Sequence, residues 1–173
     1  MKAVPLMHPS LSNARVTHFQ PPTAIMNIER IDHIGIRVTE RQRALDFYAL
    51  LGFEVALEVD FDAVLVLKNA KGIELNLIVN GVDTLGSRNI LMDVEQKHPG
   101  ITHVAFAVED ISACRADLTA KGILITQGPV SFGDGHVSLF FRDPDKNTLE
   151  LRSRLKPGEE DQIEGLSFYD PKG

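Results

Sequence analysis

Two histidines occupy matching places in two apolar stretches of the sequence, IDHIGIRV and ITHVAFAV. Side chains alternate across a strand, so His33 shares a face with Gly35 and Arg37. In the second stretch, His103 shares a face with two alanines. A histidine followed by very small residues is typical of a strand that lines a ligand site, because Gly or Ala leaves space that Val or Leu would fill.

Each histidine has a carboxylate counterpart further along its half of the chain. In IELNLIV the leucines form the core face, which places Glu74 and Asn76 on the other face; in TLELRS, Glu150 lies opposite the leucines. A lone His on a strand is usually a hydrogen-bonded filler, and a lone Glu is usually solvated. The same residue types recur in both halves, and this recurrence favours a functional site.

Two imidazoles and two carboxylates around one cavity suit a divalent first-row metal, since imidazole suits Zn, Ni and Fe and carboxylates extend the choice to Mn and Mg. Without a cation the carboxylates would face each other uncompensated, which is costly. We therefore expect one divalent ion (Zn, Ni, Co, Mn or Fe), with four ligands. They are His33, Glu74, His103 and Glu150. The sequence leaves open whether Glu74 or Asn76 faces the metal, and whether one chain or two form the site.

The elements that position these residues form a repeat. Residues 31–55 align with residues 101–125, and in each copy an alternating stretch leads into an amphipathic helical pattern. Each helical pattern stops at a glycine, Gly52 or Gly122, which suits the left-handed C-cap position. An extended segment and a hairpin follow in each copy, and the hairpins turn at NAKG and at DPDKN.

This order predicts an α+β fold of two tandem β-α-β-β-β modules, which form a curved mixed sheet of eight strands around a metal-binding cleft, with the helices outside. We expect the modules at residues 28–81 and 99–154, joined by a linker at 82–98. Residues 1–27 and 155–173 are aperiodic and punctuated by Pro and Gly. We interpret them as an N-terminal arm and a C-terminal tail.

Composition narrows the function classes. The 173 residues carry a net charge of −6 with no basic cluster, which disfavours nucleic acid and anionic membranes as partners. No apolar stretch approaches the roughly 18 residues of a membrane helix. The single cysteine, Cys114, excludes an internal disulfide framework and favours a reducing compartment, so we expect a cytoplasmic protein. The candidate site in its cleft indicates a small-molecule substrate as the partner.

Residues 28–153, with the motifs DHIGIRV, GIELNL, THVAFAV and RDPDKNTLEL, resemble the vicinal oxygen chelate superfamily of glyoxalases, bleomycin-resistance proteins and extradiol dioxygenases. His33, Glu74, His103 and Glu150 fall where glyoxalase I places its metal ligands. The three ligands other than Glu74 also match the two-His-one-carboxylate set of the dioxygenases. Glu74 is therefore the residue that distinguishes the glyoxalase I ligand set from that of the dioxygenases.

The resemblance implies a lyase or isomerase that acts on the hemithioacetal of a thiol and a 2-oxoaldehyde through a metal-bound enediolate. Glu150 or Glu74 would be the catalytic base. Arg37 resembles an arginine that binds the glutathione carboxylate. Glyoxalase I commonly has a glutathione-binding Asn at the place of Ile78; this chain has Asn76 nearby, so Arg37 and Asn76 are the candidate substrate-binding residues.

Two other functions remain open at this point. One is a non-haem Fe(II) ring-cleaving dioxygenase that uses His33, His103 and Glu150. The other is a metal-free module that binds a small molecule such as a drug without chemistry. Members of the superfamily often form dimers in which strands of both chains complete each site, so the resemblance also implies a homodimer.

Overall fold

The computed structural model describes residues 26–59 and 63–170. The chain divides into two compact units, residues 1–31 and residues 32–173. Every described helix and strand belongs to the second unit. The predicted arm, residues 1–27, lies outside the described residues except for its last two, which belong to no helix or strand.

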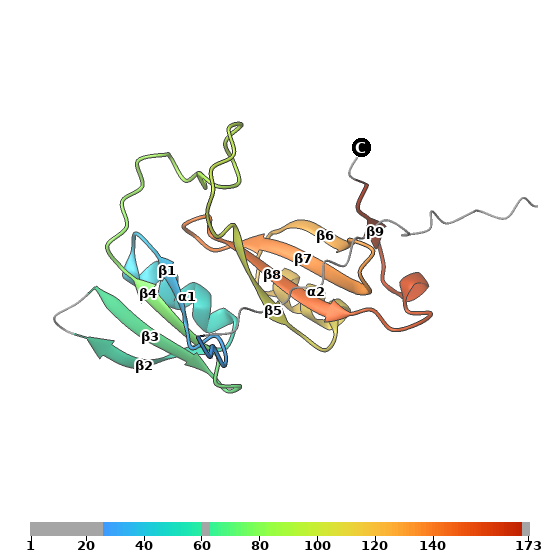
Figure 1. Cartoon of the computed structure of the whole chain (residues 1–173), viewed down its shortest axis with the longest axis horizontal. Coiled ribbons are helices and arrows are strands. Elements are labelled where there is room, and N and C mark those ends of the chain that lie inside the picture. The colour runs from blue at the N-terminus through green and yellow to red at the C-terminus, as the bar shows by residue number, and fades with distance from the viewer. Residues whose placement is uncertain (1–25, 60–62, 171–173) are drawn as a thin grey trace, which may run out of the picture. The chain divides into compact units, whose positions relative to one another are not determined.

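The first module is a mixed sheet with one helix. Its elements are β1 (Ile34–Arg37), α1 (Arg41–Leu50), β2 (Phe53–Val59), β3 (Val64–Asn69) and β4 (Glu74–Ile78). The strand order is β1-β4-β3-β2, with β1 parallel to β4 and the other neighbours antiparallel (Figure 1). The first strand is therefore placed next to the last strand of the module, and these are the two strands that carry the candidate site residues.

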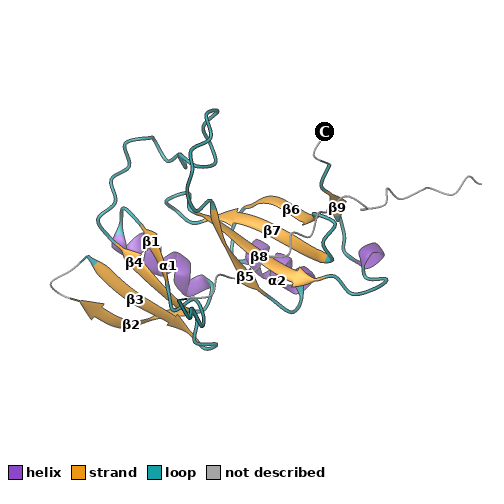
Figure 2. Cartoon of the chain, in the orientation of Figure 1, coloured by secondary structure: helices purple, strands orange, loops and turns teal. Residues whose placement is uncertain are grey.

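The second module repeats this arrangement. Its elements are β5 (His103–Ala107), α2 (Ile111–Ala120), β6 (Ile125–Ser131), β7 (His136–Arg142) and β8 (Thr148–Arg154). The order in the sheet is β5-β8-β7-β6-β9, and β5 is parallel to β8 as β1 is to β4 (Figure 2). The predicted α+β fold with tandem β-α-β-β-β modules is confirmed. The strands differ from the predicted eight-stranded arrangement in that they pair into two separate sheets, one for each module.

The ninth strand comes from the region predicted as a C-terminal tail. After a 3-10 turn, η1 (Glu160–Gln162), the short strand β9 (Ser167–Phe168) pairs in parallel with β6. Ile163, which lies between η1 and β9 in the sequence, is buried in the apolar core. Leu155 and Leu166 also pack against this core, but the spacing of these three residues follows neither a helix nor a strand period, so the sequence pattern does not indicate the docking.

Both helices begin and end by the same devices. The carboxylates of Glu40 and Asp110 accept hydrogen bonds from backbone N–H groups of the first turns of α1 and α2, which satisfies donors that the helix leaves free. The chain leaves each helix through a glycine with positive φ, Gly52 at 84° and Gly122 at 71°. The predicted glycine stops are thus confirmed.

The same pattern of hydrogen bonds from backbone N–H groups to one side chain holds both hairpin turns. In the first module the Asn69 side chain accepts hydrogen bonds from the backbone N–H groups two and four residues further on, both at 3.0 Å. Asp143 does the same in the second module, at 2.9 and 2.8 Å. These are the turns that the NAKG and DPDKN sequences predict, and they set the first residues of β4 and β8.

Helix α1 of the first module anchors the Asp143 turn of the second. The Tyr48 hydroxyl donates a hydrogen bond to Asp143 Oδ2 at 3.0 Å, and the rings of Phe47 and Phe141 are 6.4 Å apart. Desolvation raises the pKa of the Asp143 carboxyl, although its hydrogen bonds to Asn147 and Tyr48 oppose this, and burial raises the pKa of the Tyr48 phenol well above its usual value. The turn that precedes β8 is therefore held in the core that both modules share.

The segment between the modules, from residue 80 to residue 100, contains turns and bends but no helix or strand. Arg142 Nη2 contacts Asp93 Oδ1 at 2.8 Å, and the Asn89 side-chain amide donates to the Lys146 carbonyl at 3.0 Å. These contacts attach the segment to the β7–β8 hairpin. Among the described residues, no helix has both the length and the apolar character to cross a membrane.

Candidate active site

A histidine and a buried glutamate meet on the face of the second sheet. His103 starts β5, and Glu150 lies in the parallel neighbour β8, opposite Ala105. His103 Nε2 is 3.1 Å from Glu150 Oε2, and the exposed fraction is 38% for the imidazole and 4% for the carboxylate. The strand pairing thus presents an accessible imidazole beside a carboxylate that solvent hardly reaches.

The other carboxylate oxygen has its own partners. The Ser138 hydroxyl of β7 donates to Glu150 Oε1 at 2.5 Å, and Arg152 Nη1 lies 3.6 Å from the same atom. Arg152 also forms an ion pair with Asp134, in the loop between β6 and β7. A buried carboxylate is costly unless it is paired and hydrogen-bonded. Here both oxygens of Glu150 have partners, so the charge is compensated in place.

The orientation of the His103 ring is set from its other side. Nδ1 is 2.9 Å from the Thr102 hydroxyl oxygen, and the ring packs edge-on against Phe140 with 5.7 Å between the centroids. Nδ1 therefore has a hydrogen-bond partner, and Nε2 lies against the Glu150 carboxylate. This arrangement presents one edge of the imidazole and one carboxylate oxygen together, the geometry that proton transfer or shared ligation requires.

The predicted ligands of the first module lie in other surroundings. His33 precedes β1, is about half exposed, and has its Nδ1 3.1 Å from Asp32 Oδ2. Glu74 Oε2 is 3.1 Å from Lys68 Nζ of the neighbouring strand. Among residues 26–59 and 63–170, no three or more His, Cys, Asp or Glu side chains gather where they could hold a metal ion. The four predicted ligands are thus placed as one touching pair and two separate residues.

Strand register shows which residue of the first module corresponds to Glu150. In the second sheet Glu150 lies opposite Ala105, and in the first sheet Asn76 lies opposite Gly35. Leu75 corresponds to Leu149 in the same way, so that Glu74 corresponds to a threonine, Thr148. By position in the sheet, Asn76 is therefore the counterpart of Glu150.

Asn76 and Arg37 are the predicted substrate-binding residues. The Asn76 Oδ1 atom is buried and has no hydrogen-bond partner in the part of the chain that the structure describes. Arg37 lies in β1, exposed on the same side as His33, and its backbone carbonyl accepts a hydrogen bond from the Asn147 side chain at 3.1 Å. An unpaired buried acceptor is costly, and the Asn76 amide oxygen therefore keeps the capacity to accept a hydrogen bond.

Sequence reasoning did not single out Ser138, Arg152 or Asp134 as parts of the site. By strand alternation Arg152 lies on the same face as Glu150, but alternation alone is weak evidence that it belongs to the site. Ser138 alternates with Phe140 in HVSLFF, but only the pairing of β7 with β8, which places Ser138 opposite Arg152, brings its hydroxyl to Glu150. Asp134 lies in a loop, where no periodicity indicates the direction of a side chain.

The sequence and fold of this chain match a known class of protein. Residues 30–151 match the family model described as "Glyoxalase/Bleomycin resistance protein/Dioxygenase superfamily". The chain therefore belongs to this superfamily, as the sequence motifs predict.

Individual relatives agree with this assignment. The chain is similar to the glyoxalase domain-containing protein RDO1 of Mycosarcoma maydis, with 26% identity over 141 residues, which are 74% of this chain and 70% of the relative. Among solved structures, it resembles the glyoxalase family protein from Enterococcus faecalis, with 30% identity and a TM-score of 0.60 over 73% of this chain and 99% of the other. The crystal structure of SMU.1112c has a TM-score of 0.61 and 29% identity over the same shares.

Proposed function

We propose that this protein is a divalent-metal-dependent, glyoxalase-like lyase or isomerase. Its substrate would be a small oxygenated molecule, such as the hemithioacetal of a thiol and a 2-oxoaldehyde. The observation that carries the proposal is the 3.1 Å contact between His103 Nε2 and Glu150 Oε2. A buried carboxylate beside an imidazole that a small molecule can reach is typical of an active site.

The chemistry of the donor atoms fits a metal in part. An imidazole nitrogen and a carboxylate oxygen suit Zn, Ni, Co, Mn and Fe, and His103 with Glu150 supplies one of each. The ion would act as a Lewis acid on the substrate oxygens and so ease the loss of a C–H proton. His33 and Glu74 would complete the donor set. Because they lie apart from the pair, we propose a homodimer in which the first module of one chain meets the second module of its partner.

The neighbours of Glu150 define what the protein contributes. Ser138 holds Oε1, which leaves Oε2 directed at His103, and Arg152 balances the charge. We assign the proton transfer to Glu150 rather than to Glu74, because Lys68 holds the Glu74 carboxylate at 3.1 Å. A fixed carboxylate of this kind contributes about 100-fold or more to a proton transfer.

Metal reconstitution tests the proposal. The purified protein is stripped with a chelator and reloaded separately with Zn, Ni, Co, Mn or Fe(II). Retained metal is then measured, together with isomerisation of the hemithioacetal of methylglyoxal and glutathione. We expect one retained ion per site and turnover with at least one metal. Absence of both retention and turnover with every metal would overturn the proposal and favour a metal-free binding protein.

A mixing experiment tests the shared site. The His33→Ala and His103→Ala variants are each inactive in a site that needs both histidines. If two chains share each site, refolding the two variants together restores activity, since one of the two sites in a mixed dimer keeps both histidines. If a single chain holds the whole site, no mixture recovers activity. Metal retention by the mixture provides a second measurement.

The register of the first sheet favours a second candidate, an Fe(II) ring-cleaving dioxygenase. Asn76, not Glu74, is the counterpart of Glu150, and this leaves His33, His103 and Glu150 as a two-His-one-carboxylate set. Such a set keeps positions open for O₂ and substrate. Oxygen consumption with catechol after loading with Fe(II) is the measurement that supports this candidate.

Glu74→Gln separates the two candidates. A four-ligand lyase loses metal affinity and turnover in this variant by about 100-fold or more, whereas a three-ligand oxygenase keeps both. Glu54→Gln is the matched control, because Glu54 is an exposed residue of β2 in the same sheet. It should resemble the wild type in either case.

A further inference from the structure

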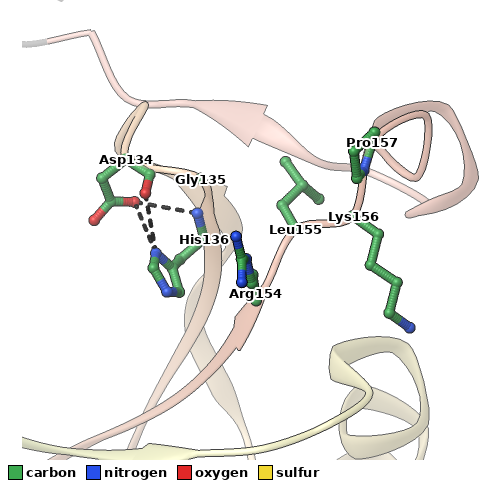
Figure 3. A pocket seen from close by; sticks show the side chains of 7 residues that line it. All are labelled: Asp134, Gly135, His136, Arg154, Leu155, Lys156 and Pro157. Carbon is green, nitrogen blue, oxygen red and sulfur yellow. Dashed lines mark hydrogen bonds and ion pairs between the residues drawn. The ribbon is translucent and has the colours of Figure 1, made fainter.

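A basic cavity lies at one end of the second sheet. It has a volume of about 610 Å³ and is lined by residues 134–136 and 154–157, from the start of β7, the end of β8 and the segments next to them (Figure 3). This size lies within the usual range for small-molecule sites, about 300–1,000 Å³.

The charges that line the cavity are mostly positive. His136, Arg154 and Lys156 contribute three basic side chains, and one lining residue, Asp134, is acidic. Asp134 forms an ion pair with Arg152, and it also contacts His136, whose Nδ1 is 3.1 Å from the Asp134 carbonyl oxygen and 3.8 Å from Oδ1. Within the described part of the chain, the Arg154 guanidinium has no hydrogen-bond or ion-pair partner, and Lys156 Nζ reaches only Glu159, at 4.0 Å. In a protein of net charge −6, Arg154 and Lys156 thus place two available cationic donors at one cavity.

The cavity lies on the sheet face that carries the His103–Glu150 pair. Along β8 the residues 150, 152 and 154 alternate onto one face, and β7 places Phe140, Ser138 and His136 opposite them. In Figure 3 the side chains of His136 and Arg154 lie next to each other, with Lys156 beyond Arg154. Arg152 contacts both Glu150 and Asp134, so polar contacts connect the cavity to the pair.

The distance between Glu150 and Arg154 indicates how long a molecule must be to contact both the His103–Glu150 pair and the cavity. Arg154 lies four positions after Glu150 along β8, which corresponds to about 13 Å. This is about the length of four extended peptide residues. A carboxylate or a phosphate is the group that arginine recognises best, through two parallel N–H donors.

We propose that residues 134–136 and 154–157 form an anion subsite, which binds the carboxylate or phosphate end of an elongated substrate whose reacting end lies at His103 and Glu150. The binding of an anion stands on the cavity and its charges alone. The statement about the reacting end rests on the proposed function. Arg154 and Lys156 are then specificity-determining residues that contact the substrate far from the reacting atoms.

Anion binding is tested without turnover. Succinate and inorganic phosphate are titrated separately into the ¹⁵N-labelled protein, and the amide chemical shifts of residues 134–136 and 154–156 are followed. We expect saturable shifts with at least one of the two anions, and the tighter of the two identifies the recognised group. Arg154→Gln should weaken the binding about tenfold or more. Lys71→Gln, which removes the same charge from the exposed turn between β3 and β4, should not.

A second experiment tests whether the subsite contributes to substrate binding. The hemithioacetals of methylglyoxal with glutathione, which is anionic, and with 2-mercaptoethanol, which is neutral, are compared as substrates. Arg154→Gln should raise the ratio of the KM of the anionic adduct to that of the neutral one about tenfold, and Lys71→Gln should leave the ratio unchanged.

The outcomes separate the two proposals. If neither adduct reacts but an anion binds in the wild type and is lost in Arg154→Gln, the proposed function fails and the anion subsite stands. If the adducts react and Arg154→Gln alters neither anion binding nor the KM ratio, the subsite is overturned and the proposed function stands. Shifts that do not saturate with either anion also overturn the subsite.

Discussion

The two modules have the same architecture but place different chemistry at one corresponding position. In the second module, Glu150 is surrounded by His103, Ser138 and Arg152. In the first module, the same place in the sheet holds Asn76, and its cross-strand neighbour on β3 is Val66. The counterparts of Ser138 and Arg152 are Val64 and Ile78, which are apolar.

This difference shows that duplicated folds need not duplicate a site. Caps, turns and the parallel pairing of first and last strands occur in both halves, because they are required for each module to fold. A buried charge is stable only with a complete set of partners. Among the described residues, the Glu150 position of the second module has such a set, and the corresponding position of the first module holds an uncharged residue. The first module instead offers a neutral amide with an unpaired oxygen, beside Gly35, where an added Cβ would meet only Ile78, at 3.6 Å. The two halves therefore provide different parts of the proposed site.

The largest expected effect comes from the position at which the modules differ. Glu150→Gln should lower hemithioacetal turnover by about 100-fold or more, because the group assigned to proton transfer loses its charge. Asn76→Ala should lower it by no more than about tenfold, since Asn76 would contribute one hydrogen bond. Steady-state kinetics of both variants measure this. Equal losses of turnover in the two variants would show that these positions of the two modules contribute equally to the reaction.

The hairpin turns provide a comparison of stability. Asp143→Ala removes a carboxylate that four donors share, including the buried Tyr48 hydroxyl, and it should cost about 3 kcal/mol or more of unfolding free energy. Asn69→Ala removes two hydrogen bonds from a partly exposed turn, which water can replace, and should cost about 1 kcal/mol. Urea denaturation measures both. A larger loss in Asn69→Ala would contradict the role assigned to the Tyr48–Asp143 contact.

Ser138→Ala tests the partner set of Glu150. The carboxylate would lose its 2.5 Å hydrogen bond but keep the contacts with His103 and Arg152, so turnover should fall by several-fold to about tenfold, which corresponds to one hydrogen bond. Ser153→Ala removes a buried hydroxyl one residue beyond Arg152, on the opposite face of β8, and serves as the control. If the two variants behaved alike, Ser138 would have no specific effect on Glu150.

The smallest effect is a pH dependence. Because burial raises the pKa of Tyr48 well above its usual value, the unfolded chain releases this proton first, at about pH 10. The folded protein then binds more protons than the unfolded one, and the unfolding free energy falls as the pH rises beyond that value. Tyr48→Phe should flatten this decrease, whereas Tyr169→Phe, at an exposed ring, should preserve it. Thermal unfolding between neutral and strongly alkaline pH measures the slopes.

Much of the fold can be predicted from the sequence, and less of the site. The repeat, the helix stops at Gly52 and Gly122 and both hairpin turns follow from local patterns, because each depends on residues close together in the chain. Strand alternation also placed His103 and Glu150 on one face. Ser138 and Asp134 could not be predicted in the same way, since they reach the site through pairing between β7 and β8 and through a loop.

The sequence by itself determined the tandem modules and the residue types available for chemistry, because periodicity and turn residues act over a few positions. Only the tertiary structure decided which of these residues meet. Strand pairing places Asn76, not Glu74, at the position that corresponds to Glu150. It also brings several partners to the Glu150 carboxylate, whereas His33 lies apart from this group. The physical reason is strand register, which depends on pairing between distant segments and moves a side chain to a different neighbour with each shift of two residues.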